Sequence, residues 1–346
     1  GKIKSPISLG RVIKQAPSAP DIPDYPAPYF RGANGGIYVS VKGVDGEEEH
    51  RQIYHNDLYV VRRLRDVELG EAIVMRLHLP KDGVREFTVP LTAVTSKEEL
   101  RKQLSMQGIA IARMDELMQY TTTWVNELQS QSEADEAHRQ FGWSDDECES
   151  FILGNQEIFK DRVDFNPPSS QTVGLFSYFE PKGSLEGWKE AINFYNQDNL
   201  VLHQFVVGTS FGSPLMQFVP IRCAGLHIHS KESGVGKTTA MEAGVSVWGS
   251  PEDLIIHERD TFNTKMNRGE VYHNLPLYMD ELTNANGKEL SNLAYQLTGG
   301  RQRGRMSANS NTERARGDAW KLLSVTTGNT SIVERISMIK AMPKAE

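Results

Sequence analysis

Residues 229–240 read HSKESGVGKTTA, between an apolar run that ends near Ile228 and a helix-like segment from Met241 to Val247. Gly234 and Gly236 give the backbone the freedom that a close approach to a phosphate requires. In loops of this kind, successive backbone N–H groups surround phosphate oxygens, and the following helix adds its positive N-terminal end. The stretch therefore predicts a phosphate-binding loop. The alternative is a strand-to-helix turn that binds nothing.

Individual loop residues have expected roles. Lys237 is expected to reach the β and γ phosphates of a nucleotide, and the Thr238 hydroxyl is expected to bind Mg²⁺. The usual pattern G-x-x-x-x-G-K-[ST] has a glycine where this chain has Lys231, so the geometry at the start of the loop departs from the pattern. ATP and Mg²⁺ are the predicted cofactors, and the residues predicted to bind them are Ser233, Gly234, Val235, Gly236, Lys237, Thr238 and Thr239.

The composition indicates a protein of about two domains, since the chain has 346 residues. Two cysteines cannot form a disulfide framework, and no apolar run reaches membrane-spanning length. We therefore expect a cytoplasmic protein, in a bacterial host cell if the resemblance described below holds, with no membrane partner. The net charge of −7 means that any contact with nucleic acid has to come from a local basic patch.

Three regions are expected along the chain. Residues 1–28 are rich in proline and predict an extended arm. Residues 29–168 predict a β-rich α+β domain, with alternating strands between 37 and 89, a hairpin turn at 80–83 and an amphipathic helix from Met114 to Leu128. The prolines and serines of 166–170 predict the domain boundary. Residues 169–346 then form the second domain.

The second domain alternates between apolar strands and helices. Strands are expected at 225–229, 254–257, 275–279 and 322–326, and helices at 238–248, 261–270 and 288–297. Short buried strands that alternate with helices predict an α/β fold with a mostly parallel sheet covered on both faces.

Two further motifs follow the loop. The apolar run 275–279 ends in Asp280 and Glu281, 43 positions beyond Lys237. In Mg²⁺-assisted hydrolysis of a nucleoside triphosphate, Asp280 can hold the metal and Glu281 can orient the attacking water. The run 321–326 is followed by Thr327 and Asn329, either of which would lie near the γ-phosphate if its strand were beside the carboxylate strand.

A basic segment lies between these motifs. Residues 299–318 contain five arginines against Glu313 and Asp318. Such a segment predicts a protruding loop that contacts nucleic-acid phosphates, and a solvated surface loop is the alternative. Arg301, Arg303 and Arg305 are the predicted DNA-binding residues. Arg314, Arg316 and Arg335 are candidates for an arginine given to the γ-phosphate of a neighbouring subunit.

Five short stretches carry a family resemblance: GVGKTTA at 234–240, SVWGSP at 246–251, YMDE at 278–281, LTGG at 297–300 and WKLL at 320–323. The chain resembles the helicase-like "domain of unknown function 927" family of phage and mobile-element primase-helicases, which is similar to superfamily-3 and AAA+ helicases. The likeness covers most of the chain, more loosely before Phe141.

The resemblance implies a P-loop NTPase fold of the AAA+ or superfamily-3 kind and a ring-shaped homo-oligomer, expected to be a hexamer. ATP would be bound between subunits, and the basic segment would face DNA in the pore. The chain begins with glycine and ends 17 residues after Asn329. We therefore expect a fragment of a longer protein that lacks a C-terminal lid or an arginine-bearing segment, and a primase domain is a candidate partner.

The sequence thus predicts an ATP-hydrolysing DNA helicase or translocase of phage or mobile-element replication. Its partners would be single-stranded or forked DNA, further copies of itself and other replication proteins. The alternative is an AAA+-like ATPase that remodels or loads a protein partner without moving on DNA. A small-molecule kinase built on the same loop and a nucleotide-free structural module are the remaining alternatives.

Overall fold

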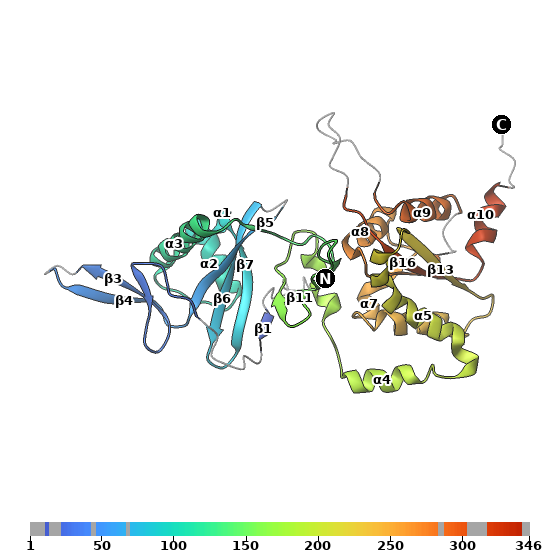
Figure 1. The fold of residues 1–346 in the computed structure, drawn as a ribbon, viewed down its shortest axis with the longest axis horizontal. Coiled ribbons are helices and arrows are strands. Elements are labelled where there is room, and N and C mark those ends of the chain that lie inside the picture. Colours follow the sequence, from blue (N-terminus) through green and yellow to red (C-terminus); the bar gives the residue numbers. More distant parts are fainter. Residues whose placement is uncertain are drawn as a thin grey trace, which may run out of the picture. The chain divides into compact units, whose positions relative to one another are not determined.

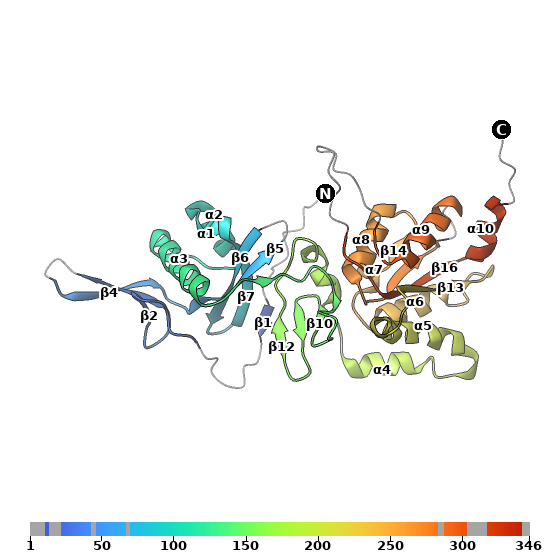
Figure 2. The ribbon, with the colours of Figure 1, turned by 45° about the horizontal axis from the view of Figure 1, so that its top comes forward.

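The computed structural model describes residues 11–13, 22–42, 46–66, 70–282, 287–302 and 317–340. The chain forms two compact units. The first contains residues 1–138 and 165–173, and the second contains 139–164 and 174–346. Figures 1 and 2 follow the chain through both units by colour.

The first unit is built on two sheets. Strands β5 (Leu58–Asp66), β6 (Gly70–Leu79) and β7 (Gly83–Pro90) form an antiparallel core, with β1 (Arg11–Ile13) beside β7 and the short β8 (Asp135–Glu136) parallel to β5. The hairpin predicted at 80–83 joins β6 to β7 with Leu79 opposite Gly83. Strands β2 (Tyr29–Arg31), β3 (Ile37–Lys42) and β4 (Glu48–Tyr54) form the second sheet.

Helices α1 (Leu91–Val94), α2 (Lys97–Met106) and α3 (Met114–Gln131) contribute to the hydrophobic core of this unit. On α3 the predicted apolar face is confirmed. Its buried side chains recur at three- and four-residue steps and are those of Met114, Leu117, Tyr120, Thr121, Trp124 and Val125.

The described parts of the segment expected to be an extended arm, residues 11–13 and 22–28, belong to this unit, which corrects the division made from the sequence. Strand β1 pairs with the edge of β7, and Tyr25 is buried with its hydroxyl on the Asp57 carboxylate at 3.0 Å. Prolines exclude a helix here, but they do not prevent a short stretch such as 11–13 from adding to a sheet edge.

The boundary also differs from the expected break at 168/169. Phe141 and Ile152 are both buried in the core of the second unit, and the Phe141 amide donates to the Val271 carbonyl at 2.8 Å. Strands β9 (Gly142–Trp143), β10 (Phe151–Leu153), β11 (Gln156–Ile158) and β12 (Val163–Phe165) form a small sheet in this region. Long-range packing, which has no local signal, assigns 139–164 to the second unit.

The second unit contains the predicted parallel sheet, in the order β13 (Cys223–His229), β16 (Leu322–Gly328), β15 (Leu277–Asp280) and β14 (Ile256–His257). All three pairings are parallel. Helices α5 (Val201–Gly212) and α6 (Lys237–Val245) cover one face, and α8 (Phe262–Tyr272) and α9 (Gly287–Gly299) cover the other, as both views show (Figures 1 and 2). The fold class expected from the alternating pattern, α/β with a covered parallel sheet, is confirmed.

The remaining elements surround this sheet. They are η1 (Val173–Phe179), α4 (Leu185–Asn193), η2 (Asp198–Leu200), η3 (Ser213–Phe218), α7 (Pro251–Leu254) and α10 (Ile332–Lys340). In the described part of the chain, no helix combines the length and apolar character needed to cross a membrane.

Candidate active site

The predicted phosphate-binding loop follows β13 and leads directly into α6. Gly234 and Gly236 have φ angles of 75° and 84°, in the left-handed region that favours glycine. Gly236 is the N-cap of α6, and no side chain caps this helix end. The backbone amides of 233–239 make no hydrogen bond to any other described residue. Together with the helix dipole, these unpaired donors create a site suited to an anion.

Lys237 is the first residue of α6, and its ammonium group reaches back across the loop. Its Nζ lies 3.2 Å from the Ser230 carbonyl oxygen and 3.0 Å from that of Glu232. Lys231, which stands where the usual pattern has glycine, does not have a positive φ. This loop therefore needs no glycine at that position. Thr238 and Thr239 follow Lys237 in the first helical turn and are both exposed.

The predicted carboxylates lie at the end of β15. Asp280 is the last residue of the strand, and Glu281 has a φ of 52°, an uncommon conformation for a residue other than glycine. The Glu281 amide donates to Asp280 Oδ1 and to Thr327 Oγ1, each at 3.0 Å. The Thr327 hydroxyl in turn donates to Asp280 Oδ1. These bonds hold the turn after Asp280 in its left-handed form.

The strand order brings the loop and the carboxylates to one edge of the sheet. Strand β16 lies between β13 and β15, with Gly328 opposite His229 and Thr326 opposite Met279. Because the strands are parallel, their carboxyl ends share an edge, which is where open α/β sheets bind ligands. Neighbouring strands are about 4.8 Å apart, so the loop strand and the carboxylate strand are separated by about 10 Å. The candidate site therefore extends across the end of β16.

Asn329 and Arg335 come after the middle strand. Asn329 directly follows β16, in the turn beside the loop, where the Ser230 amide donates to the Gly328 carbonyl at 3.4 Å. The structure therefore places Thr327 against the Asp280 carboxylate and the Glu281 amide, and Asn329 in the turn that follows β16. Arg335 lies on α10 and is half-buried.

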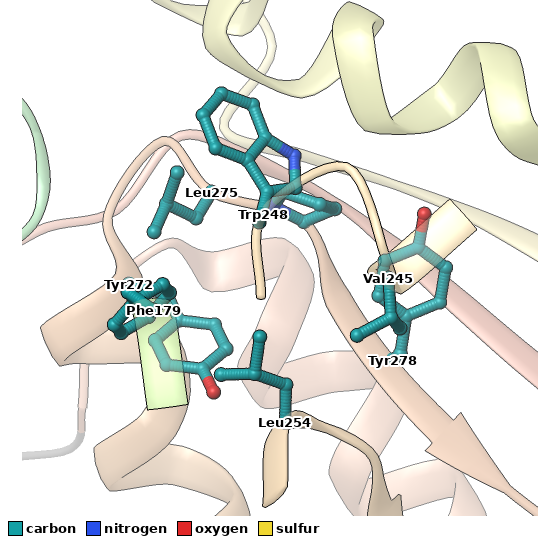
Figure 3. Close-up of a pocket in the computed structure, with 8 residues that line it drawn as sticks. Phe179, Val245, Trp248, Leu254, Tyr272, Leu275 and Tyr278 are labelled. Atoms are coloured by element: carbon teal, nitrogen blue, oxygen red, sulfur yellow. The ribbon is translucent and has the colours of Figure 1, made fainter. Parts of the chain in front are cut away.

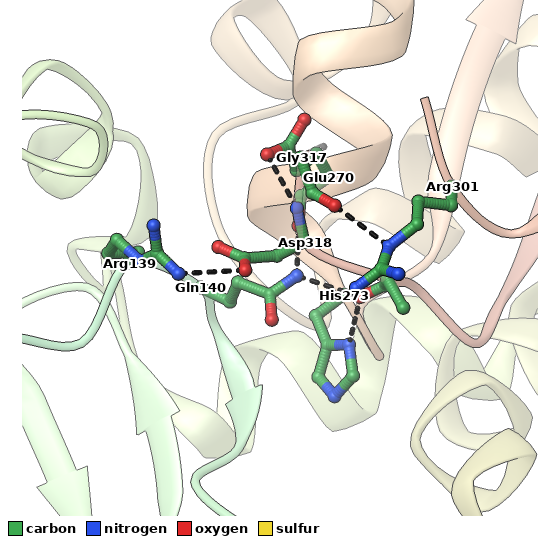
Figure 4. Close-up of polar contacts among 8 residues, drawn as sticks. Arg139, Gln140, Glu270, His273, Arg301, Gly317 and Asp318 are labelled. Atoms are coloured by element: carbon green, nitrogen blue, oxygen red, sulfur yellow. Dashed lines mark hydrogen bonds and ion pairs between the residues drawn. The ribbon is translucent and has the colours of Figure 1, made fainter. Parts of the chain in front are cut away.

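The ends of the basic segment are fixed to α8 through one carboxylate. Glu270 accepts hydrogen bonds from the Asp318 amide at 2.9 Å and from Gln302 Nε2 at 2.6 Å. Burial raises the pKa of the Glu270 carboxyl. Figure 4 shows the contact of Glu270 with the Asp318 amide and the contacts around it. Arg139 donates to the Asp318 carboxylate at 2.8 Å, Gln140 donates to the Glu270 carbonyl, and the His273 ring contacts the Ala319 carbonyl.

Of the arginines predicted to act in this segment, Arg301 is in the described part. Its Nε donates to the Gly317 carbonyl at 2.9 Å (Figure 4), so this side chain helps to close the base of the segment. The other four predicted arginines of the segment, Arg303, Arg305, Arg314 and Arg316, lie outside the described residues.

Two histidines near the site were missed in the sequence. His227, on β13, lies with Nδ1 2.8 Å from Thr326 Oγ1 and with Nε2 2.9 Å from the Thr330 carbonyl. Burial lowers the pKa of His227, which favours the neutral ring. The sequence signal that could have identified His227 is the presence of a histidine within an otherwise apolar strand. His203, on α5, contacts the loop from 32 positions before Val235 and had no such signal.

An apolar pocket lies between η1, α6 and β15 (Figure 3). Its lining consists of Phe179, Val245, Trp248, Leu254, Tyr272, Leu275, Pro276 and Tyr278. The lining is mostly apolar, and its Tyr278 hydroxyl and Trp248 indole N–H are already hydrogen-bonded to Ser210, so it is poorly suited to a charged phosphate. The pocket is therefore separate from the candidate site.

Metal binding at the site would depend on few protein ligands. Among the residues that the structure describes, no group of three or more His, Cys, Asp and Glu side chains is arranged to hold a metal ion. Mg²⁺ in phosphate-binding sites usually takes one or two carboxylates and completes its shell with phosphate oxygens and water. The Asp280 carboxylate, at the end of β15, and the Thr238 hydroxyl, in the first turn of α6, are groups of the kinds in that donor set.

A family model matches most of the chain, residues 30–317. No curated protein matches the chain. The family model described as "Domain of unknown function (DUF927)" matches residues 30–317, which include the phosphate-binding loop, both carboxylates and most of the first unit. The chain therefore belongs to the domain of unknown function 927 family.

Proposed function

We propose that this protein is an ATPase that hydrolyses ATP at the edge shared by β13, β16 and β15. One observation carries the proposal: a loop of unpaired amides with Lys237 and a pair of acidic residues lie at the carboxyl ends of two strands that are separated by a single strand. This arrangement matches the two requirements of phosphoryl transfer, which are binding of the phosphates and stabilisation of the charge that develops on them.

Each residue has a role in this proposal. The amides of 233–239 and the Lys237 ammonium bind phosphate oxygens, which frees the lysine from the Ser230 and Glu232 carbonyls. Asp280 and Thr238 would hold Mg²⁺, which would supply positive charge beside the phosphates when bound. Glu281 orients and polarises the attacking water, and Asn329 lies where an amide can hold that water.

The work driven by hydrolysis is proposed to be movement along DNA during phage or mobile-element replication. The basic segment supports this, because its base is anchored through Glu270 to α8, the helix that precedes β15 and its carboxylates. Arg301, Arg303 and Arg305 are the proposed phosphate contacts on single-stranded or forked DNA. The resemblance to ring-forming helicases supports a homo-oligomer, with a hexamer expected, in which Arg314, Arg316 or Arg335 acts on the neighbouring subunit's nucleotide.

DNA-stimulated ATPase activity tests this function. Lys237→Ala removes the phosphate contact and Glu281→Gln removes the carboxylate that polarises water, so each is expected to lower turnover by at least about 100-fold. Matched controls are Lys288→Ala on α9 and Glu252→Gln on α7, which alter exposed side chains outside the site. Turnover unchanged in either site variant would refute the assignment.

A second function, remodelling or loading of a protein partner, is favoured by a different observation. Large apolar side chains on α5 and η3 are more than half exposed; they include Leu202 (80%), Phe205 (62%), Phe211 (54%), Leu215 (59%) and Phe218 (63%). Such surfaces are typical of protein contacts. ATPase activity that DNA does not stimulate, with no strand separation, would select this function over translocation.

A further inference from the structure

His203 connects α5 to the candidate phosphate-binding loop. Its Nε2 lies 3.1 Å from the Val235 carbonyl oxygen. A carbonyl can only accept, so Nε2 carries the hydrogen. The other ring nitrogen, Nδ1, is buried and has no hydrogen-bond partner among the described residues. The ring also stacks on Tyr195, with centroids 6.0 Å apart and planes inclined by 18°, which sets its orientation.

This contact determines which way a loop amide points. The peptide between Val235 and Gly236 is trans, so its C=O and N–H point in opposite directions. With the carbonyl held by His203, the Gly236 N–H is directed away from α5. The imidazole also fits against the bare Cα of Gly236, since a Cβ added there would lie 3.0 Å from His203 Nε2.

We propose that His203 is a positioning residue for phosphate binding, which holds the Val235–Gly236 peptide so that the Gly236 amide is already oriented toward the phosphate. The inference rests on the proposed nucleotide site and adds a residue that lies outside its sequence motif. His203 itself contacts the loop and not the phosphate.

The expected change in nucleotide affinity follows from the free energy that one hydrogen bond contributes. Without His203 the peptide has to be ordered when the nucleotide binds, and this ordering cost weakens affinity. A net contribution of about 0.5–1.5 kcal/mol corresponds to about a 2- to 12-fold change in a binding constant. Because the bond acts equally on bound substrate and transition state, KM should rise while kcat changes little.

Three variants of the full chain test this. His203→Phe keeps an aromatic ring beside Tyr195 and removes the hydrogen-bond donor. His203→Asn has an amide donor on a side chain that is too short to reach the Val235 carbonyl. His203→Gln has an amide donor on a side chain of similar reach to histidine. The measurements are KM and kcat for ATP, the dissociation constant of a fluorescent ATP analogue, and Tm. We expect KM about 5- to 10-fold higher for Phe and Asn, kcat within about twofold, and KM within about twofold of wild type for Gln.

The control is Leu202→Ala, the exposed residue that precedes His203 on α5, which should leave KM unchanged. A purely structural role for His203 would lower Tm and the active fraction, hence kcat, and leave KM of the folded molecules unaltered. An unchanged KM in Phe and Asn overturns the inference, and so does a raised KM that Gln fails to restore. If wild-type protein and Lys237→Ala both fail to bind the analogue, the proposed ATPase function fails instead.

Discussion

The hydroxyl group of Thr327 donates a hydrogen bond to the carboxylate of Asp280, so the middle strand of the parallel sheet is joined to the end of the carboxylate strand. The same hydroxyl accepts the Glu281 amide at 3.0 Å. One side chain thus positions both acidic residues of the candidate site. It also stabilises the positive φ of Glu281, a conformation that costs about 1–3 kcal/mol and persists where the surroundings enforce it.

Replacing Thr327 should therefore affect hydrolysis more than binding. Thr327→Val has nearly the same shape but cannot make either hydrogen bond, and we expect kcat for ATP to fall by about 10-fold or more, with the dissociation constant of ATP changed by less than about threefold. Thr327→Ser keeps the hydroxyl and should retain most of the activity. Steady-state kinetics and nucleotide titration measure the two quantities, and equal kcat values for Val and Ser would contradict this role.

Two loop glycines should differ in how well they tolerate a side chain. Both Gly234 and Gly236 have positive φ, which costs an alanine about 1 kcal/mol or more at either position. An added Cβ meets nothing within 4 Å at Gly234, whereas at Gly236 it approaches His203. Gly236→Ala should therefore weaken ATP binding more than Gly234→Ala, by about 5-fold or more. Titration of both variants with a fluorescent ATP analogue checks the order, and equal affinities would contradict it.

Stability should depend on pH through Glu270. Burial raises the folded-state pKa of this carboxyl above its usual value of 4.5, so the charged form is disfavoured in the folded protein. The difference in unfolding free energy between wild type and Glu270→Gln should then favour wild type most below about pH 4.5, and should decline as pH rises through the raised pKa. Urea titrations at several pH values measure it. A difference that grows with pH would show the opposite shift.

The basic segment should produce a salt-dependent affinity for DNA. If Arg301, Arg303 and Arg305 each contact a phosphate, the triple alanine variant should flatten the slope of log K against log salt concentration by about 2 to 3, at about 0.7–0.9 per lost contact. Because Arg301 Nε already binds the Gly317 carbonyl, Arg301→Ala is best measured separately. An unaltered slope would remove these arginines from the DNA interface.

Local pattern was sufficient for many of the secondary-structure elements of both units. The strands ending at His229 and Asp280, the helix after the phosphate-binding loop and the apolar face of α3 were all predicted. Each depends on periodicity or on turn chemistry, which act over a few neighbouring residues. The residues with the clearest candidate chemistry, Lys237, Asp280 and Glu281, follow from the same short motifs.

Tertiary structure alone decided which of these elements meet. The position of β16 between the other two motif strands brings Thr327 to Asp280 across 47 positions of chain, and packing in the core assigns 139–164 to the second unit. The contact of His203 with Val235 joins residues 32 positions apart, and no local sequence pattern indicates it. Motif residues are constrained by their own chemistry and are visible in sequence, whereas the residues that hold them in place are chosen by the geometry of packing.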